Sequence, residues 1–355
     1  MCFAMSSAEN CRKEEKSYED VLFISEGLNQ HSSEGYTKYA NRIAAELKKG
    51  GGTVIGYGHA DGDIQDLHVK GLNSFAALKL LLGQKQKHIL VAPWVIDRWC
   101  LLLILLYQLM GRKCRLLIIW YPQPTPSQKR TIQAAFRVFH PDLYLAAKDV
   151  YEDFQQWYRG NLYHVSAAVD TGKFVPVSPE RKQELREKYG LPQDKLIFFH
   201  AGHIVRDRRL DWLLHLPENC LGVMACSSFW NPDQEIYAKL KEKQNVRILS
   251  EDYPHIEELF QAIDVYVFTP TVNGAIRTPL SVFEAMACNQ YVVSTRHGEL
   301  AAVEEGDGLV YVDGEDPRKT VSAAMELLNH RPPCHTREKT LGYDWNAAVE
   351  NLIHW

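Results

Sequence analysis

Short apolar runs alternate with longer amphipathic stretches along most of the chain. In the first half, these runs are long and uninterrupted enough to be parallel strands that are covered on both faces. Amphipathic and polar segments of helical length separate them, so the pattern predicts β-α units and a parallel sheet. The runs occupy residues 21–25, 53–58, 88–93, 114–121, 143–148 and 162–166.

The first predicted helix has recognisable ends. Tyr39, Ile43 and Leu47 recur at helical spacing, which places them on one face. Ser32 or Ser33 can cap the N-terminus of this helix. The glycines at 50–52 end it, because glycine readily adopts the conformation that terminates a helix.

A polar, proline-containing segment at 168–179 interrupts the alternation, and a short polar helix follows it and ends at Gly190. The alternation then restarts. Two sets of β-α units predict an α/β protein with two Rossmann-like domains that face each other across a cleft, with ligands at the carboxyl ends of the strands. The second set has strands at 196–202, 220–226, 245–249, 265–270, 291–295 and 309–313, and helical stretches at 207–216, 232–243, 255–263, 279–289 and 316–328.

Size, charge and cysteine content agree with this picture. A chain of 355 residues exceeds one ordinary core, so two domains are expected. The net charge of −4 argues against nucleic-acid binding, which needs a basic surface. The eight cysteines form no CxxC pair and no zinc-ligand spacing, which predicts reduced thiols in a cytoplasmic protein. Charged residues close to the N-terminus favour a flexible segment at residues 1–18 and argue against a signal peptide.

The apolar run at 99–107 resembles a membrane span but is about half the roughly 20 residues that a bilayer requires. Charged residues flank it on both sides. A buried helix is the favoured interpretation. A shallow peripheral contact with a membrane stays open as the alternative.

The first candidate site lies where a helix is expected to open after residue 277. Thr278 is a good N-cap, and Pro279 suits the first helical turn. Unpaired backbone N–H groups there attract an anion, and Arg277 adds a positive charge. Glu284 follows less than two turns later, where a carboxylate can accept hydrogen bonds from ribose hydroxyls. The alternative is that Glu284 points to solvent.

The second candidate follows the strand at 196–202. Gly202 permits close approach of a ligand to the backbone, and His203 comes directly after it. Arg206, Arg208 and Arg209 lie at an expected helix start, and guanidinium groups match phosphate oxygens. A solvated basic turn is an equally weighted alternative.

The loop before the first helix is a third, weaker candidate. Ser33, Glu34 and Gly35 could approach an acceptor or a phosphate at the helix N-terminus. The acidic turn at 61–63 is better explained as solvated than as a metal site. The GxGxxG, GxSxG and P-loop motifs are absent, which lowers the dinucleotide-binding, hydrolase and NTPase interpretations.

Several of these segments, in order, resemble the family-4 retaining glycosyltransferases of GT-B fold (glycosyl transferases group 1). The similarity extends from about residue 162 to 345. Its most specific part is TPLSVFEAMACNQYVVST, which resembles "P..vlEAMA.G.PVV.t". Four further parts of the chain match. Residues 166–192 resemble the family's linker, and residues 196–214 resemble its "GR…K G" segment. Residues 245–249 and 255–270 resemble the stretch before the donor site, and residues 342–352 resemble the closing helix.

The resemblance implies four regions and several residue roles. Residues 1–18 would be flexible, 19–168 the acceptor-binding domain, 169–335 the nucleotide-sugar-binding domain, and 336–355 a C-terminal helix that packs back on the first domain. Glu284 corresponds to the glutamate on the nucleotide ribose, and Arg208 to the basic residue on the donor diphosphate. The remaining donor-binding positions would be Gly202, His203, Arg206, Arg209, Arg277, Thr278, Pro279 and Leu280.

The chain also departs from the family pattern. The first of two motif glutamates falls at Ile276, and the arginine after Gly202 is His203. Asn289 replaces a glycine, and the acceptor-domain histidine corresponds to Trp120 or Tyr121. These differences concern the donor sugar and the catalytic machinery.

The expected function is transfer of a sugar from a UDP- or GDP-sugar to a glycan, lipid-linked or small-molecule acceptor. The resemblance implies retention of anomeric configuration and no metal or other cofactor. Two alternatives stay open. One is a catalytically degenerate protein that acts as partner or regulator of a glycosyltransferase, and the other is a GT-B nucleotide-sugar epimerase.

Overall fold

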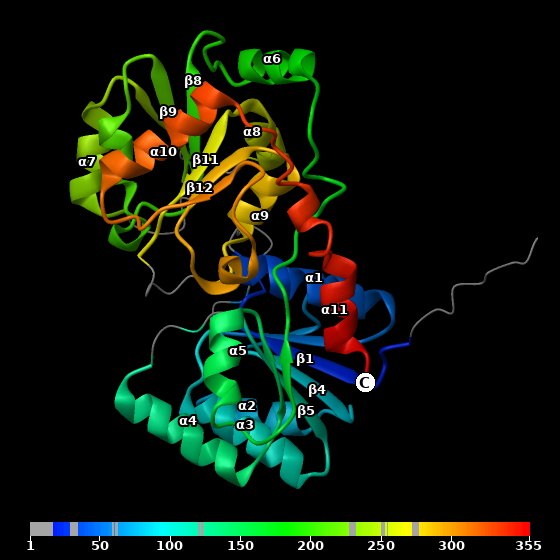
Figure 1. Cartoon of the computed structure of the whole chain (residues 1–355). Coiled ribbons are helices and arrows are strands. Elements are labelled where there is room, and N and C mark those ends of the chain that lie inside the picture. The colour runs from blue at the N-terminus through cyan, green and yellow to red at the C-terminus, as the bar shows by residue number, and fades with distance from the viewer. Residues whose placement is uncertain are drawn as a thin grey trace, which may run out of the picture.

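The computed structural model contains two α/β domains, seen in Figure 1 with the N-terminal sheet in blue and cyan below the C-terminal one. Both sheets are entirely parallel. This confirms the predicted fold class. The structure describes residues 17–28, 35–58, 60, 63–119, 121, 124–226, 232–249, 253, 255–271 and 277–355.

The N-terminal sheet has the strand order β3-β2-β1-β4-β5-β6-β7. Each of the six predicted apolar runs corresponds to a strand. The runs at 114–121, 143–148 and 162–166 extend beyond the C-terminal ends of their strands. β3 was not predicted, because it has only three residues and two of them are exposed, so no apolar run marks it. The strands are β1 (Val21–Ser25), β2 (Thr53–Tyr57), β3 (Leu67–Val69), β4 (His88–Ala92), β5 (Lys113–Ile118), β6 (Asp142–Leu145) and β7 (Leu162–His164).

Helices cover both faces of this sheet. α1 (Gly35–Lys49) and α11 (Trp345–Ile353) pack on one face, and α2 (Phe75–Leu82), α3 (Arg98–Leu109), α4 (Pro126–Val138) and α5 (Lys148–Gln155) on the other. α3 contains the apolar run at 99–107 and buries Leu103, Ile104 and Tyr107 against the sheet, which confirms the buried-helix interpretation. Within the described part of the chain, no helix combines the length and the apolarity needed to span a bilayer.

The C-terminal sheet has the order β10-β9-β8-β11-β12-β13. Its strands are β8 (Leu196–Ala201), β9 (Cys220–Ala225), β10 (Val246–Leu249), β11 (Val265–Phe268), β12 (Tyr291–Ser294) and β13 (Leu309–Tyr311). Its helices are α6 (Pro179–Lys188), α7 (Gln234–Glu242), α8 (Ile256–Ala262), α9 (Leu280–Ala287) and α10 (Pro317–His330).

The helical stretch expected at 207–216 is not one α-helix. It consists of two 3₁₀ segments, Arg206–Arg208 and Leu210–His215. Arg209 separates them in the left-handed conformation, with a φ of 49°. A residue with that φ cannot continue a right-handed helix, so the arginines do not start a common helical turn.

The linker and the chain end join the two domains. Val169 pairs with Asp344, and its N–H donates to the Tyr343 carbonyl at 2.9 Å. α11 then packs on α1, where the Tyr39 and Trp345 rings lie 4.7 Å apart in an edge-on contact. One continuous buried cluster runs from the α1 face of the first domain through the linker into the second. The predicted return of the C-terminal helix is thereby confirmed.

Candidate active site

The C-terminal sheet reverses its strand order between β8 and β11, which are neighbours in space although not in sequence. In doubly wound sheets, ligands bind outside the carboxyl ends of the strands at such a reversal. Gly202 and Arg208 follow β8, and Thr269 follows β11. The second candidate from the sequence therefore lies at the position where doubly wound sheets bind ligands.

Arg208 is the buried member of the three arginines. Its guanidinium lies over the Phe268 ring, 4.9 Å from the centroid, and the side chain is only 9% exposed. Gly202, with a φ of 149°, makes room for it: a Cβ at this position would lie 3.6 Å from Arg208 Nη2 and 3.3 Å from His200 Nε2. A side chain at residue 202 would narrow the space beside both groups.

The neighbouring cations have different surroundings. Arg209 donates to the Gly314 carbonyl at 2.7 Å and to Glu315 at 2.9 Å, on the loop after β13. Arg206 is exposed, and His203 is half-buried beside Gly202. Of the three arginines, Arg208 is the one that the fold buries at the carboxyl end of β8.

Two buried histidines flank Arg208. The His200 ring stacks on Phe268 with centroids 5.5 Å apart, and the His297 ring stacks on the same phenylalanine at 6.0 Å. Burial, reinforced by Arg208, lowers the pKa of His200 to about 3. Burial, reinforced by Arg277 and Arg208, lowers the pKa of His297 to about 4. Both imidazoles are neutral at pH 7, so Arg208 supplies the positive charge beside the Phe268 ring.

The segment before α9 differs from the sequence expectation. α9 starts at Leu280 with Pro279 at the N-cap position, and no side chain caps it. Thr278 was predicted to be the cap and is not, because its hydroxyl donates to the Ala146 carbonyl of the N-terminal domain. The Thr278 hydroxyl therefore forms a contact between the domains and does not cap α9.

Arg277 is held on both sides. Its guanidinium contacts Asp149 of α5 at 2.8 Å, and its carbonyl accepts from the Glu299 N–H at 2.8 Å. Gly298 adopts a φ of 53°, and a Cβ there would lie 1.9 Å from the Arg277 carbonyl oxygen. Only glycine fits this close approach. The loop after β12 thus fixes the backbone of the residues that precede α9.

Glu284 does not point to bulk solvent. It is 6% exposed, and Oε1 forms an ion pair with Lys38 Nζ on the first turn of α1. It also lies close enough to Tyr266, together with Arg208, to influence the pKa of that phenol, which burial raises above its ordinary value. Because the Tyr266 hydroxyl contacts Ala201 at the end of β8, Glu284 and Arg208 belong to one neighbourhood.

The N-terminal domain faces this neighbourhood. A Cβ on Gly35 would lie 3.5 Å from Leu280 Cδ1, so the start of α1 meets the start of α9. His164 of β7 contacts the buried Glu299 at 2.8 Å. The predicted loop residues Ser33 and Glu34, and the departing position Ile276, lie outside the described residues.

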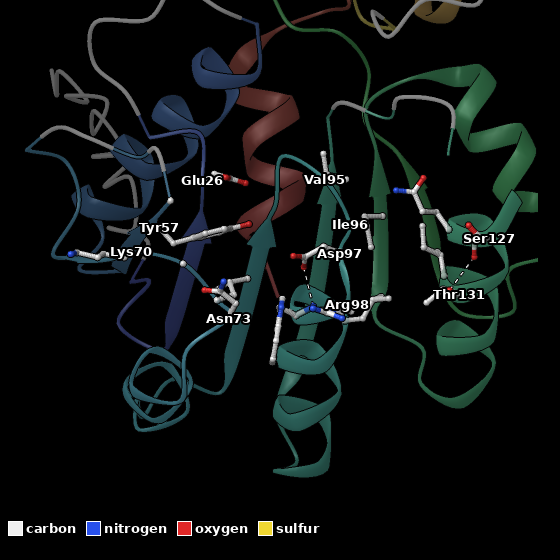
Figure 2. Close-up of a pocket in the computed structure, with 17 residues that line it drawn as sticks. Glu26, Tyr57, Lys70, Asn73, Val95, Ile96, Asp97, Arg98, Ser127 and Thr131 are labelled. Carbon is white, nitrogen blue, oxygen red and sulfur yellow. Dashed lines mark hydrogen bonds between the residues drawn. The ribbon is translucent and has the colours of Figure 1, made fainter. Parts of the chain in front are cut away.

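A pocket of about 790 Å³ opens in the N-terminal domain, where β1 and β4 form the corresponding reversal of strand order. Glu26 follows β1, and Tyr57 ends β2. Asp97 and Arg98 begin α3, and Ser127 begins α4 on the far side (Figure 2). The pocket combines two carboxylates, two cations and the Trp99 ring, the mixture of polar groups and aromatic surface that suits a polyhydroxylated ligand.

Several of these residues carry no signal in the sequence. Lys38 and Asp149 look like ordinary charged helix residues, and only the packing of the domains brings them to Glu284 and Arg277. His297 sits in a short loop with no motif of its own. Asp97 reads as a helix cap, which it also is, since it accepts from the N–H groups of Trp99 and Cys100.

Comparison with known proteins agrees with this geometry. The family model described as "Glycosyl transferases group 1" matches residues 224–330. The chain is 27% identical over 227 residues to a D-inositol 3-phosphate glycosyltransferase of Corynebacterium urealyticum, covering 58% of this chain and 53% of that one. It is 29% identical over 287 residues to a protein of the same name from Xylanimonas cellulosilytica, covering 74% and 68%. The chain thus spans about half to two thirds of the length of these relatives.

The fold is also similar to a solved structure. Anabaena Alr3699/HepE in complex with UDP superposes with a TM-score of 0.77, at 13% identity, over 94% of this chain and 98% of that one. At that identity the likeness concerns the fold alone. Residues 224–330 thus match the group 1 glycosyltransferase family, and the chain as a whole has the two-domain fold of the GT-B glycosyltransferases.

Proposed function

We propose that the protein transfers a sugar from a nucleotide-diphosphate sugar to a glycan, lipid-linked or small-molecule acceptor. The observation that supports this most directly is the convergence of Arg208, Gly202 and Glu284 at the carboxyl ends of β8 and β11, facing the N-terminal domain. A guanidinium suits a diphosphate, and a buried carboxylate suits ribose hydroxyls.

The donor is a UDP- or GDP-sugar in this proposal. Alr3699/HepE, which shares the fold, is solved in complex with UDP, and this favours UDP as the first ligand to test. The donor nucleotide would lie on the C-terminal domain. Arg208 would contact the diphosphate, and Glu284 the ribose.

The pocket between Glu26 and Ser127 is the proposed acceptor site. It lies at the carboxyl edge of the N-terminal sheet, the same edge at which α1 meets α9. Both carboxylates, Glu26 and Asp97, can accept hydrogen bonds from sugar hydroxyls, and the Trp99 ring offers an apolar face. These groups favour a carbohydrate portion of the acceptor over a purely apolar one.

Catalysis would depend on electrostatics. When the bond between the anomeric carbon and the diphosphate oxygen breaks, negative charge grows on the leaving diphosphate. A positioned guanidinium such as that of Arg208 stabilises this charge by about 2.7–4 kcal/mol if it resembles other preorganised donors of its kind. We propose that the reaction retains the anomeric configuration and needs no metal ion, as the family resemblance implies.

A ligand screen tests the donor proposal. UDP-, GDP-, ADP- and TDP-sugars are added to the purified protein, and the melting temperature and the release of nucleotide diphosphate are measured. Stabilisation by one base together with turnover is the expected outcome. Stabilisation without turnover on any acceptor would assign the chain to the catalytically degenerate alternative, and interconversion of the donor without an acceptor would assign it to the epimerases. No stabilisation by any of the four would refute the proposal.

Filling the pocket tests the acceptor proposal. Thr131 lines the pocket from an exposed position of α4, so Thr131→Trp should block it without disturbing a core. We expect kcat/KM for the acceptor to fall at least about tenfold, since a misplaced acceptor loses that much or more. Hydrolysis of the donor should stay unchanged. The control is Arg130→Trp, one position earlier and exposed outside the pocket lining; equal losses in both variants would contradict the assignment.

A further inference from the structure

The ion pair between Lys38 and Glu284 joins two residues that are 246 positions apart in the chain. Lys38 lies on the first turn of α1 in the N-terminal domain, and its side chain is 30% exposed. The Glu284 side chain is 8% exposed on α9. The acceptor domain thus supplies a cation directly to the carboxylate that we assign to the donor ribose.

Ribose hydroxyls and Lys38 would share one carboxylate, whose two oxygens can accept several hydrogen bonds. Lys38 binds Oε1 of Glu284, and hydroxyls of a bound ribose need those oxygens as acceptors. An ammonium that loses its anion in a partly buried interface costs free energy, because its desolvation is then uncompensated. A ribose that shares Glu284 weakens the contact of that carboxylate with Lys38, and a second anion beside the ammonium would offset the loss.

The donor diphosphate is that anion. Glu284 shares the neighbourhood of Tyr266 with Arg208, the residue assigned to the diphosphate. Lysine has a flexible four-carbon stem, so its ammonium can move between adjacent anions. α1 is fifteen residues long and begins at Gly35 beside Leu280, so its N-terminus adds positive potential at the same place.

Two of the other cations near the site are already paired with carboxylates. Arg277 is paired with Asp149 at 2.8 Å, and Arg209 with Glu315 at 2.9 Å. A diphosphate has two negative charges, whereas Glu284 has one. The exchange of Glu284 for the diphosphate is therefore electrostatically favourable for Lys38.

We infer that Lys38 is a donor-site residue contributed by the acceptor domain, which exchanges Glu284 for the donor diphosphate when ribose hydroxyls occupy that carboxylate. This inference rests on the proposed function. It assigns to Lys38 the cationic role that is open at His203, where the family pattern has an arginine. The ammonium would stabilise the leaving diphosphate from the acceptor side, and nucleotide binding would draw the two domains together.

Binding of UDP and of uridine separates this role from a merely structural ion pair. Titration calorimetry measures the affinity for UDP, and saturation-transfer NMR measures the affinity for uridine, which has no phosphate. We expect Lys38→Met to lower the affinity for UDP at least about tenfold, because a hydrogen bond to a charged group is lost. Uridine should bind equally well or better, since Glu284 is no longer occupied. Lys38→Arg should recover UDP binding to within about threefold of wild type, because it keeps the charge.

Two further variants keep the test specific. Lys48→Met removes a lysine from the far end of the same helix, where it pairs with the exposed Asp66. This variant should leave the affinities for UDP and uridine unchanged. Glu284→Gln should weaken UDP and uridine alike, because it alters the ribose contact. Unchanged or tighter UDP binding by a folded Lys38→Met protein would overturn the inference and leave the proposed function intact. A wild-type protein that binds none of UDP, GDP, ADP and TDP would overturn both; if it binds one of the others and not UDP, that nucleotide and its nucleoside are the probes.

Discussion

At the scale of single residues, the arginines that follow β8 are not equivalent. Arg208 is buried over Phe268, whereas Arg209 is bound to Gly314 and Glu315. Their spacing in the sequence suggests a shared role, but the left-handed backbone at Arg209 turns the two side chains to different partners. The difference between adjacent arginines provides a matched experiment.

We expect Arg208→Ala to lower the affinity for the nucleotide sugar, or its turnover, at least about tenfold, since a charged contact to the diphosphate is lost. Glu284→Ala should have an effect of at least about the same size through the ribose. Arg209→Asn is the control, because asparagine tolerates the left-handed conformation. It should leave the affinity for the nucleotide unchanged. Calorimetric affinities that are unchanged in both Arg208→Ala and Glu284→Ala would remove the site assignment.

His297 provides a prediction about pH. Its pKa is about 4 in the folded protein, below the ordinary value of 6.5, so the unfolded chain binds a proton more readily between these values. The contribution of His297 to stability is therefore complete above about pH 6.5 and is lost as the pH falls towards about 4. The slope from this one residue is at most about 1.4 kcal/mol per pH unit.

His297→Phe should keep the stacking on Phe268 and remove the titration. We expect the difference in unfolding free energy between wild type and variant to change by up to about 3 kcal/mol between pH 7 and pH 4, with wild type losing more. Urea unfolding at several pH values measures this difference. A difference that is independent of pH would show that His297 titrates normally.

At the scale of elements, the loop after β12 and the segment before α9 depend on each other. Gly298 allows the Glu299 N–H to reach the Arg277 carbonyl, and Arg277 in turn contacts Asp149. The loop conformation thus determines where the backbone of the proposed donor site lies. This loop is most sensitive to substitution at Gly298, because a side chain there would clash with the Arg277 carbonyl oxygen.

We expect Gly298→Ala to destabilise the protein by more than the roughly 1–3 kcal/mol of a strained backbone alone, because its Cβ also clashes with Arg277. Nucleotide affinity should fall with it. Gly111→Ala is the control, since Gly111 has a similar φ of 76° but no atom within 4 Å of an added Cβ. Thermal unfolding and UDP titration measure both effects. Equal destabilisation by the two variants would contradict the role of the Arg277 contact.

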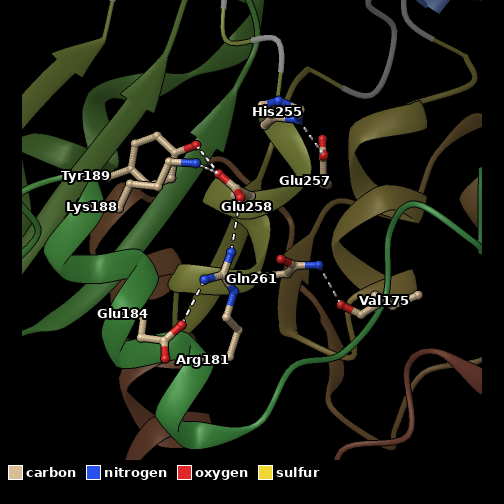
Figure 3. Close-up of polar contacts among 9 residues, drawn as sticks. All are labelled: Val175, Arg181, Glu184, Lys188, Tyr189, His255, Glu257, Glu258 and Gln261. Carbon is tan, nitrogen blue, oxygen red and sulfur yellow. Dashed lines mark hydrogen bonds and ion pairs between the residues drawn. The ribbon is translucent and has the colours of Figure 1, made fainter.

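α6 shows how the linker region is attached. Glu258 of α8 accepts from Tyr189 at 2.6 Å and from Arg181 at 3.3 Å, and it also pairs with Lys188 (Figure 3). The side chain of Gln261 donates to the Val175 carbonyl at 3.0 Å. α6 and the end of the linker are therefore fastened to the C-terminal domain.

At the scale of the whole molecule, polar side-chain pairs connect the two domains around the candidate site. Lys38 with Glu284, Asp149 with Arg277, and His164 with Glu299 each join one domain to the other. Such pairs are sensitive to substitution and to salt, because partly exposed charges are screened. In the proposed function, these pairs would allow the interface to rearrange when an anionic donor binds.

Charge reversal at the interface tests this organisation. Asp149→Lys places a cation beside Arg277, and the repulsion should open the interface and increase the radius of gyration. Asp153→Lys is the control, because Asp153 lies one turn later on α5 and pairs at 2.9 Å with Lys129 of the same domain. Small-angle scattering of both variants, with and without UDP, measures the change. Identical scattering curves for the two would refute a role for the Asp149 pair in domain closure.

The architecture was predictable from local patterns. The apolar runs identified most strands and the buried helix at 99–107, because burial on both faces of a parallel sheet leaves an uninterrupted apolar signature. β3 was not predicted, because a three-residue edge strand with exposed side chains has no such signature. The motif around Glu284 was recognisable because its residues are contiguous.

The sequence alone therefore determined the two parallel α/β domains, the group 1 motif and a candidate position for the donor. Tertiary structure decided which groups meet there. Thr278 turns to Ala146 and not to its own helix, Glu284 binds Lys38, and the pocket beside Glu26 assembles from segments that are far apart in the chain. The physical reason is sequence distance. Strand and helix signals arise between near neighbours in the chain. The pocket exists only once the N-terminal domain has folded, and the Thr278 and Glu284 contacts exist only once the two domains have packed together.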